Sequence, residues 1–382
     1  MIINELTTRL HSIYGNKLNY LEFKEFQDEL YIVGFVGTIS TRSIDLLLLD
    51  YLSKHCPNYL FLLVGPCEEE LKQLIKSRNV VVLPPVEGEY IPTIIHLFDV
   101  GFIPYIIDNS DMDYVFPRKA CEYLACGIPV VSTALNEIRL LEPYVCVASD
   151  YYEFAYLLKK SESDKYTPSS RIEFVKQYDW DVLINNLLRH LENEHISKDI
   201  VFISSIRWDY SWHRQQEMMS KMADHGYRVL FVEPCRNRKK GEEKIQEIRR
   251  NVWRIASPGL PYERCLYTVN YMNGVVSCLY IKHAVNQLKF DNPILWMDRV
   301  HGFLPSYYFK NHYVIYDLID EILAFGRYRN ERLLIGIENT VLKRADLLLS
   351  SSRTLLERKI QQSGRQGENL FIPNGLDLNR FL

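Results

Sequence analysis

Apolar runs and amphipathic segments alternate along the first half of the chain. Continuous apolar runs that close mostly in Gly, Pro or Ser are typical of buried strands, and they occur at residues 31–37, 59–65, 79–85, 99–105, 127–133 and 144–149. Segments with helical spacing of their apolar residues lie at 43–55, 68–77, 90–98 and 136–143. Strands that alternate with helices predict an α/β domain whose parallel sheet is covered on both faces.

The second half of the chain repeats this pattern. Strands are predicted at residues 199–205, 227–234, 292–298, 312–318, 345–352 and 369–375, and helices at 212–225, 268–289, 331–344 and 353–362. A polar stretch at 192–199 follows a long helical pattern at 171–191 and is the expected join. We therefore predict two Rossmann-like, doubly wound domains, residues 1–195 and residues 196–382.

The composition is that of a globular protein with two ordinary cores. Of 382 residues, 47% are hydrophobic and 24% are charged. No apolar run approaches the roughly 18 residues that a membrane span needs, and the first residues lack the pattern of a signal peptide, so we expect a cytoplasmic protein. The eight cysteines include no CxxC pair, and we expect reduced thiols rather than zinc ligands.

The formal net charge of −3 conceals a difference between the two halves. Residues 1–195 hold 17 Lys and Arg against 28 Asp and Glu, and residues 196–382 hold 28 against 20, which gives −11 and +8. A basic stretch at 236–250 could hold the second half against an anionic membrane surface at the inner face of the membrane, with a solvated helix as the alternative. We expect no nucleic-acid partner.

The stretch FPRKACEYLACGIPVVST, residues 116–133, carries the sharpest chemical signal. Pro117 suits the first turn of a helix and Gly127 can end it, so Lys119 and Glu122 fall on adjoining parts of one helix face. At the carboxyl end of a preceding strand, Lys can neutralise phosphate, and an ionised Glu can accept two hydrogen bonds from ribose hydroxyls. The alternative is an ordinary salt bridge on an exposed helix.

Two other motifs give weaker signals. In GFVGTISTRS, residues 34–43, Gly37 follows a strand ahead of a helix, which brings backbone N–H groups toward an anion. A tight turn is the alternative. Asp111 and Asp113 form a DxD pair that looks like a metal-binding motif, but the pair lies in a polar loop. We therefore expect no metal there.

Together these motifs resemble the C-terminal, nucleotide-sugar-binding domain of GT-B glycosyltransferases of the family 4 type. The resemblance covers roughly residues 31–190 and is closest in style to the bacterial enzymes of teichuronic acid and exopolysaccharide synthesis. It implies that Glu122 holds the nucleotide ribose, that Lys119 lies near the diphosphate, and that Gly37 and Thr38 line the same site. It also implies a nucleotide-sugar co-substrate, with UDP favoured, and no separate cofactor.

One position departs from the family pattern. The E-x7-E element of the family would place a Glu at Tyr114. That Glu is the acidic residue said to contact the donor sugar. The identity of the donor sugar therefore stays open.

The second half resembles the acceptor-binding domain of the same enzymes, through DIVFISSIRWDYSWHRQQ at 199–216 and YDLIDE at 316–321. An inverting transfer needs a base that takes the proton of the acceptor hydroxyl. Asp320 is the first candidate, followed by Asp317 and, more distantly, Asp209. The alternative for all three is structural, as helix caps or ion-pair partners.

His213 and Arg214 follow the first strand of this half. Either could meet the acceptor or the donor phosphates, since Arg is suited to bidentate phosphate contact. A packing role explains them equally well. His301, in a loop, is a weaker candidate for a base.

The order of the two halves is the reverse of the family's order. The segment IPNGLDLNRF, residues 372–381, normally leads into the nucleotide-binding domain but here comes last. A circular permutation, a piece of a tandem enzyme and a gene remnant all fit this order. The resemblance implies a metal-independent glycosyltransferase that moves a sugar from a nucleotide diphosphate sugar to a saccharide or lipid-linked acceptor. A nucleotide-binding fragment without catalysis and a nucleotide-sugar epimerase remain the alternatives.

Overall fold

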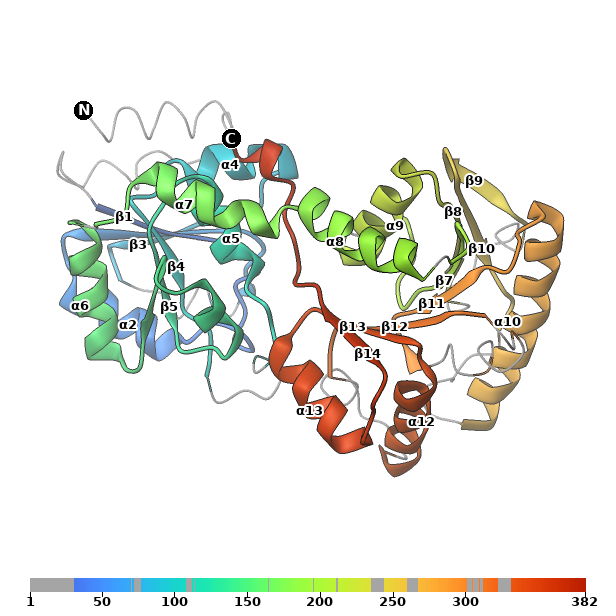
Figure 1. Ribbon diagram of the computed structural model, residues 1–382. Coiled ribbons are helices and arrows are strands. Elements are labelled where there is room, and N and C mark those ends of the chain that lie inside the picture. The colour runs from blue at the N-terminus through green and yellow to red at the C-terminus, as the bar shows by residue number, and fades with distance from the viewer. Residues whose placement is uncertain are drawn as a thin grey trace. The chain divides into compact units, whose positions relative to one another are not determined.

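The computed structural model of the chain contains two compact units, each with its own sheet (Figure 1). Unit 1 comprises Met1–Asp179 with Leu376–Leu382, and unit 2 comprises Trp180–Gly375. The structure describes residues 31–69, 71, 77–107, 112, 114–163, 165–194, 196–210, 212–234, 244–259, 267–300, 304, 309, 312–321 and 331–382.

Unit 1 is built on a six-stranded parallel sheet in the order β3-β2-β1-β4-β5-β6. Every one of its predicted strands is confirmed, as β1 (Tyr31–Val36), β2 (Tyr59–Val64), β3 (Val80–Leu83), β4 (Val100–Ile103), β5 (Val130–Thr133) and β6 (Val145–Ala148). Its α-helices include α2 (Leu46–His55), α4 (Ile91–Ile95), α5 (Arg118–Ala125), α6 (Tyr151–Ser161) and α7 (Pro168–Val175). The helix expected at 136–143 is instead a 3-10 helix at Glu137–Leu141.

Successive side chains of a strand point to opposite faces of the sheet, so the two faces pack against different helices. Gly34 and Gly101 are register partners on β1 and β4. A Cβ on Gly34 would lie 2.0 Å from the ring of Phe98, and one on Gly101 would lie 2.3 Å from the ring of Tyr123. Glycine at both positions therefore lets two aromatic rings lie directly on the sheet. Phe102, the next residue of β4, packs on the opposite face against α6.

Unit 2 contains an eight-stranded sheet in the order β14-β13-β12-β11-β7-β8-β10-β9. Its strands are β7 (Asp199–Ile203), β8 (Arg228–Glu233), β9 (Gln246–Arg249), β10 (Val252–Ala256), β11 (Ile294–Met297), β12 (Val314–Leu318), β13 (Leu347–Ser350) and β14 (Glu368–Phe371). Its α-helices include α8 (Trp180–Asn193), α9 (Arg214–Asp224), α10 (Tyr267–Leu288), α12 (Glu331–Arg344) and α13 (Arg353–Ser363). All the strands and helices predicted for this half are present.

The β9–β10 hairpin is absent from the predicted pattern. Part of the basic stretch at 236–250, for which a helix was the expected alternative to membrane contact, forms β9 and pairs antiparallel with β10. Asn251 makes the turn with a φ of 64°, a conformation that Asn tolerates better than most residues. Residues 235–243 lie outside the described part of the chain, so a role of this stretch at a membrane stays a prediction.

The units differ from the predicted domains at two places. Helix α8, which we assigned to the first domain, buries Trp180 and Ile184 in the core of unit 2. The last residues of the chain belong to unit 1, where Leu376 pairs with Asp179 and Phe381 is 3% exposed. Both differences have one cause, since each segment belongs to the unit whose core buries its apolar side chains.

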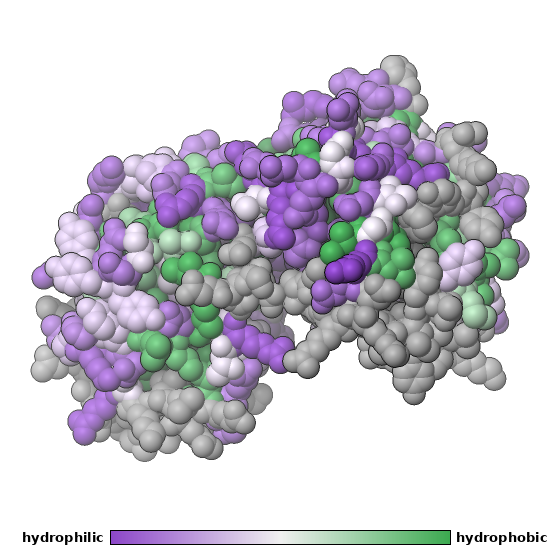
Figure 2. Space-filling view, turned by 90° about the horizontal axis from the view of Figure 1, so that it is seen from below, coloured by the Kyte–Doolittle hydropathy of each residue, from purple (hydrophilic) through white to green (hydrophobic). Residues whose placement is uncertain are grey.

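Among the residues that are coloured by hydropathy in Figure 2, hydrophilic side chains predominate and hydrophobic ones form separate patches. Within the described residues, no helix is both long enough and apolar enough to span a membrane. Among the exposed large aromatic side chains, Tyr210 and Trp212 belong to the connection between β7 and α9.

Candidate functional site

The sheet of unit 1 changes its direction of winding between β1 and β4. From β1 the chain proceeds outward to β2 and β3, whereas β4, β5 and β6 extend on the other side. At such a switch point the two connections leave in opposite directions, and open parallel sheets bind ligands in the crevice at the carboxyl ends of the two strands. Gly37 follows β1 at this edge, and Tyr105 follows β4.

Lys119 of α5 reaches the same edge and lies against Gly37. A Cβ on Gly37 would lie 2.3 Å from Cε of Lys119 and 2.8 Å from its Nζ, so glycine leaves the room that the lysine side chain occupies. Gly37 also has a φ of 154°, which side chains disfavour. The Nζ lies 5.6 Å from the ring centroid of Phe35 on β1. Two of the residues predicted to contact the donor nucleotide are therefore adjacent.

The charge on Lys119 is stabilised by its neighbours. Burial by itself lowers the pKa of the ammonium group, but the Tyr105 hydroxyl, to which it is hydrogen-bonded, and the Glu122 carboxylate outweigh burial and raise the pKa. Lys119 is therefore a cation at neutral pH. A cation that is partly shielded from water attracts a phosphate more strongly than an exposed one does.

Glu122 lies one turn further along α5. Its Oε1 is 2.9 Å from Nε of Arg118, and its side chain is 13% exposed. The surface salt bridge that we expected as the alternative does exist on this helix, but the partner is Arg118. An ionised Glu122 held by Arg118 keeps acceptor capacity for ligand hydroxyls, because a carboxylate has about four lone-pair sites.

Tyr123 fixes α5 to the sheet, because its hydroxyl accepts a hydrogen bond from the N–H of Val36 at 3.0 Å. Val36 is the last residue of β1, so this bond sets the height of the helix above the strand end. Thr38, which we predicted to line the donor site, is exposed two residues after Val36. Tyr114, at the position where the family carries a Glu, is half-buried.

Several weaker candidates cannot be placed. The DxD pair, Asp111 and Asp113, and His301 lie outside the described residues. In the part of the chain that the structure describes, no group of three or more His, Cys, Asp and Glu side chains could hold a metal ion. The expectation that the DxD pair binds no metal stays a prediction.

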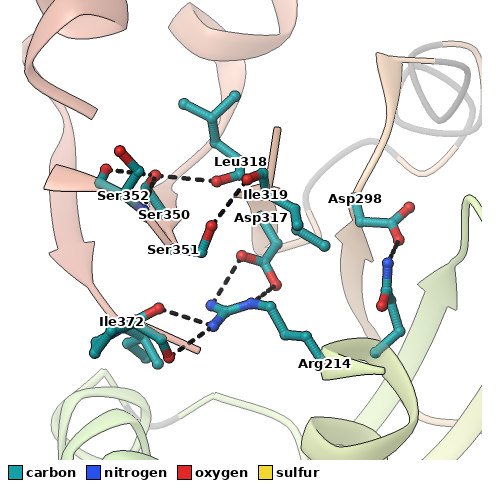
Figure 3. A network of polar contacts seen from close by, with 11 residues as sticks. Arg214, Asp298, Asp317, Leu318, Ile319, Ser350, Ser351, Ser352 and Ile372 are labelled. Atoms are coloured by element: carbon teal, nitrogen blue, oxygen red, sulfur yellow. Dashed lines mark hydrogen bonds and ion pairs between the residues drawn. The ribbon is translucent and has the colours of Figure 1, made fainter. Parts of the chain in front are cut away.

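In unit 2, Arg214 and Asp317 form a buried ion pair (Figure 3). Nε and Nη2 of Arg214 donate to the two carboxylate oxygens of Asp317, both at 3.1 Å. Nη1 donates to the carbonyl oxygens of Ile372 at 2.8 Å and Pro373 at 3.1 Å. Arg214 thus joins α9 to the ends of β12 and β14. These contacts favour the structural alternative for both residues over contact with a ligand or proton transfer.

Asp320 follows β12 and keeps contact with solvent. Desolvation by the dense protein around it raises its pKa to about 6, an effect that its exposure to water weakens. The strand end before it is held in place, since Ser350 donates to the carbonyl of Leu318 at 3.0 Å and Ser351 to that of Ile319 at 2.8 Å (Figure 3). An accessible carboxylate on a fixed backbone is suited to act as a base near neutral pH.

His213 and Asp209 lie in the connection from β7 to α9. His213 is the N-cap of α9, and its backbone N–H donates to Oε1 of Gln216 at 3.1 Å. Its exposed ring stacks on that of Tyr210 with 5.8 Å between centroids. Asp209 forms an ion pair with Arg254. Of these two candidates, His213 keeps a ring surface that a ligand could reach.

Our sequence analysis missed Asp298, which directly follows β11. Its Oδ2 accepts hydrogen bonds from Nε2 of Gln215 at 2.9 Å and from Oγ of Ser205 at 2.8 Å. Figure 3 shows its carboxylate near the ion pair of Asp317. A signal was present, because the predicted strand at 292–298 ends in an acidic residue at the carboxyl edge of a parallel sheet.

Known proteins show similarity to part of this chain. The family model described as glycosyl transferases group 1 matches residues 31–157. Over 170 residues the chain is 27% identical to the putative teichuronic acid biosynthesis glycosyltransferase TuaH of Bacillus subtilis (strain 168). That match covers 42% of this chain and 42% of TuaH, so the chain spans less than half the length of this relative.

Solved structures are less similar. Sucrose-phosphate synthase of Thermosynechococcus elongatus is 13% identical with a TM-score of 0.34, covering 47% of this chain and 91% of that one. HepE of Anabaena in complex with UDP is 19% identical with a TM-score of 0.38, covering 51% of this chain and 53% of that one. Likeness at this level supports no conclusion about ligands.

Proposed function

We propose that this chain, whose residues 31–157 match the family model of the group 1 glycosyl transferases, transfers a sugar from a nucleotide diphosphate sugar to a saccharide or lipid-linked acceptor. The observation that carries this proposal is the contact of Lys119 with Gly37 at the switch point of unit 1. A partly buried cation at the edge where parallel sheets bind ligands suits a diphosphate. The name of TuaH, which includes teichuronic acid biosynthesis, supports a role in cell-surface polysaccharide synthesis.

The donor would be held by α5 and the end of β1. Lys119 would neutralise the negative charge that grows on the diphosphate as the sugar leaves, and Gly37 with Thr38 would let the backbone approach the phosphates. Glu122, which is paired with Arg118, is the candidate for the two ribose hydroxyls. We propose that the nucleotide of the donor is a uridine diphosphate, because of the family resemblance.

Asp320 is the candidate base for an inverting transfer. As the acceptor oxygen bonds to the anomeric carbon, the bond from that carbon to the diphosphate oxygen breaks, and its electron pair stays with the diphosphate. The proton of the acceptor hydroxyl passes to Asp320, which must be ionised beforehand. A pKa of about 6 leaves this carboxylate ionised at neutral pH. We prefer it to Asp317, since both oxygens of Asp317 are bonded to Arg214.

Product analysis tests the proposal. The chain is incubated with radiolabelled UDP-sugars and with a bacterial lipid extract or free saccharides, and the labelled products are separated. Label in a saccharide or lipid product is the result that we expect. Label in an isomeric nucleotide sugar would show an epimerase, and unchanged donor together with measurable UDP binding would show a nucleotide-binding protein without transfer.

A lipid-linked acceptor would bring the protein to the inner face of a membrane, with the anionic lipid surface as a partner. Sedimentation with vesicles of phosphatidylcholine, with and without phosphatidylglycerol, tests this part of the proposal. We expect binding that depends on the anionic lipid and weakens with salt. Absence of binding to both kinds of vesicle would contradict it.

A further inference from the structure

The sheet of unit 2 has a switch point of its own, between β7 and β11. From β7 the chain winds to β8 on one side, while β11 and β12 extend on the other. Ser205, which comes shortly after β7, donates a hydrogen bond of 2.8 Å to Asp298, which follows β11. This contact therefore marks the crevice that open parallel sheets use for ligands.

The carboxylate of Asp298 is fixed on one side and unpaired on the other. Oδ2 receives hydrogen bonds from Ser205 and from Gln215 in the first turn of α9. Oδ1 is buried and has no hydrogen-bond partner among the described residues. A buried carboxylate oxygen without a donor is unfavourable, and a ligand hydroxyl that donates to it would remove that cost.

The surroundings of Asp298 set its charge near neutral pH. The polar and charged groups that face it are Gln215, Ser205, Arg299, Asp317 and Tyr316. Burial raises the pKa of Asp298 to about 6, with the negative charge of Asp317 adding to the rise and the hydrogen bonds and Arg299 opposing it. The carboxylate is therefore mostly ionised at pH 7, and the ionised form accepts hydrogen bonds from hydroxyls more strongly than the neutral form.

The connection that carries Ser205 also presents aromatic side chains. Tyr210 is 66% exposed and Trp212 is 51% exposed. Trp212 is held by a hydrogen bond from its indole N–H to Glu217 and by an edge contact with the ring of Trp208. Exposed rings that are fixed in this way suit the apolar faces of sugar rings. The connection that ends in the Gln215 turn thus offers aromatic surface, while Asp298 offers a carboxylate oxygen without a partner among the described residues, and saccharide sites use both kinds of group.

We infer that Asp298 binds a hydroxyl group of the saccharide acceptor, with Oδ1 accepting the hydrogen bond and with Ser205 and Gln215 holding the carboxylate in place. The inference rests on the proposed transferase function and extends it, because it gives unit 2 a saccharide subsite. Asp298 binds and orients the acceptor, and the proton transfer is left to Asp320.

Saccharide binding to the full chain separates this role from a structural one. Methyl glucoside, methyl N-acetylglucosaminide and methyl glucuronide are the probes, and saturation-transfer NMR measures their affinities. Asp298→Asn keeps the shape and an oxygen for Ser205 and Gln215 but puts an amide donor in place of Oδ1. We expect the variant to lose roughly tenfold or more in affinity for at least one probe, with unchanged affinity for UDP. The exposed Asp291→Asn is the matched control and should match the parent.

The pH dependence of probe binding is a readout that a structural role would not move. In the parent chain, affinity should fall as the pH drops through about 6, because protonation of Asp298 removes the negative charge. In Asp298→Asn, affinity should stay constant over the same range. Near-UV circular dichroism checks that the variant is folded. If it is not, Ser205→Ala takes its place, and we expect a loss of roughly two- to tenfold in probe affinity.

Two outcomes would contradict saccharide binding by Asp298 without contradicting the proposed donor site of unit 1. One is equal probe affinity of the parent and of both variants, and the other is UDP binding by a parent chain that binds no probe at millimolar concentration. The opposite result, probe binding that depends on Asp298 in a chain that neither binds UDP nor transfers sugar, would support the subsite and contradict the proposed transferase function.

Discussion

The two sheets share the strand arrangement around their switch points but place opposite charges there. In unit 1 the cation of Lys119 lies over Gly37, which leaves no side chain between the lysine and the strand end. In unit 2 the carboxylate of Asp298 lies beside Ser205. The fold thus supplies a binding edge twice, and the side chains brought to it determine whether the edge suits an anion or a hydroxyl.

The two edges are also supported differently. In unit 1 the support is mainly packing, since aromatic rings occupy the space above Gly34 and Gly101. In unit 2 the support is a buried ion pair between Arg214 and Asp317. A packed support is sensitive to added volume, whereas a buried ion pair is sensitive to the loss of one charge.

Breaking the ion pair should have the largest effect. Arg214→Ala leaves Asp317 buried without its partner, which typically costs about 3–5 kcal/mol in the free energy of unfolding. Urea denaturation followed by fluorescence measures it. Arg249→Ala is the matched control, because its pair with Asp224 is partly exposed and should contribute less than about 1 kcal/mol. Equal effects of the two variants would contradict the structural role of Arg214.

Adding volume to unit 1 should have the next largest effect. Gly34→Ala places a methyl group 2.0 Å from the ring of Phe98, so we expect a loss of about 1–3 kcal/mol in the free energy of unfolding. Gly336→Ala in α12 meets nothing within 4 Å and should instead stabilise the chain by up to about 1 kcal/mol. Thermal unfolding of both variants tests the contrast, which disappears if Gly34 tolerates alanine.

The contact of Glu122 with the ribose should give about a tenfold preference for UDP over 2′-deoxy-UDP. If Glu122 accepts hydrogen bonds from both ribose hydroxyls, the parent chain should bind UDP about tenfold more tightly than 2′-deoxy-UDP. Glu122→Gln should bind the two nucleotides almost equally, because an amide accepts these bonds more weakly. Calorimetric titration gives both ratios. A preference for UDP that survives the substitution would move the ribose contact to another residue.

The pH dependence of turnover should show the smallest effect. Since burial raises the pKa of Asp320 toward about 6 and exposure to water weakens that rise, acid protonates the base, and kcat/KM should fall as the pH drops below about 6. Activity that stays flat down to about pH 4, the ordinary pKa of an aspartate, would exclude Asp320 as the base. Asp320→Asn should lose turnover and keep its affinity for UDP.

Much of the fold follows from local patterns in the sequence. The strands of unit 1 are continuous apolar runs because both faces of a parallel sheet are buried. The β9 strand was not predicted, because it is a short edge strand that begins with the polar residues Gln246 and Glu247 and has no continuous apolar run. The assignment of α8 depends on which core buries Trp180, and nothing local in the sequence decides that.

The candidate sites likewise include residues that local sequence patterns identify and contacts that depend on the fold. Lys119 and Gly37 stand in motifs that their spacing and family resemblance mark, and the structure places them together. The partners of Asp298 come from segments far apart in the sequence, so they depend on strand order. The pairing of Arg214 with Asp317 likewise joins two residues that are 103 positions apart in the sequence. Sequence patterns give the candidates, and the topology selects among them.

Titration of UDP into the parent chain and into Lys119→Ala tests the central claim most directly. We predict that the variant binds UDP roughly 10- to 100-fold more weakly, because it loses a charged contact to the diphosphate. Lys159→Ala, which removes an exposed lysine of α6 and leaves the switch point intact, should bind as the parent does. Equal UDP affinity of Lys119→Ala and the parent would contradict a diphosphate site at the β1–β4 switch point.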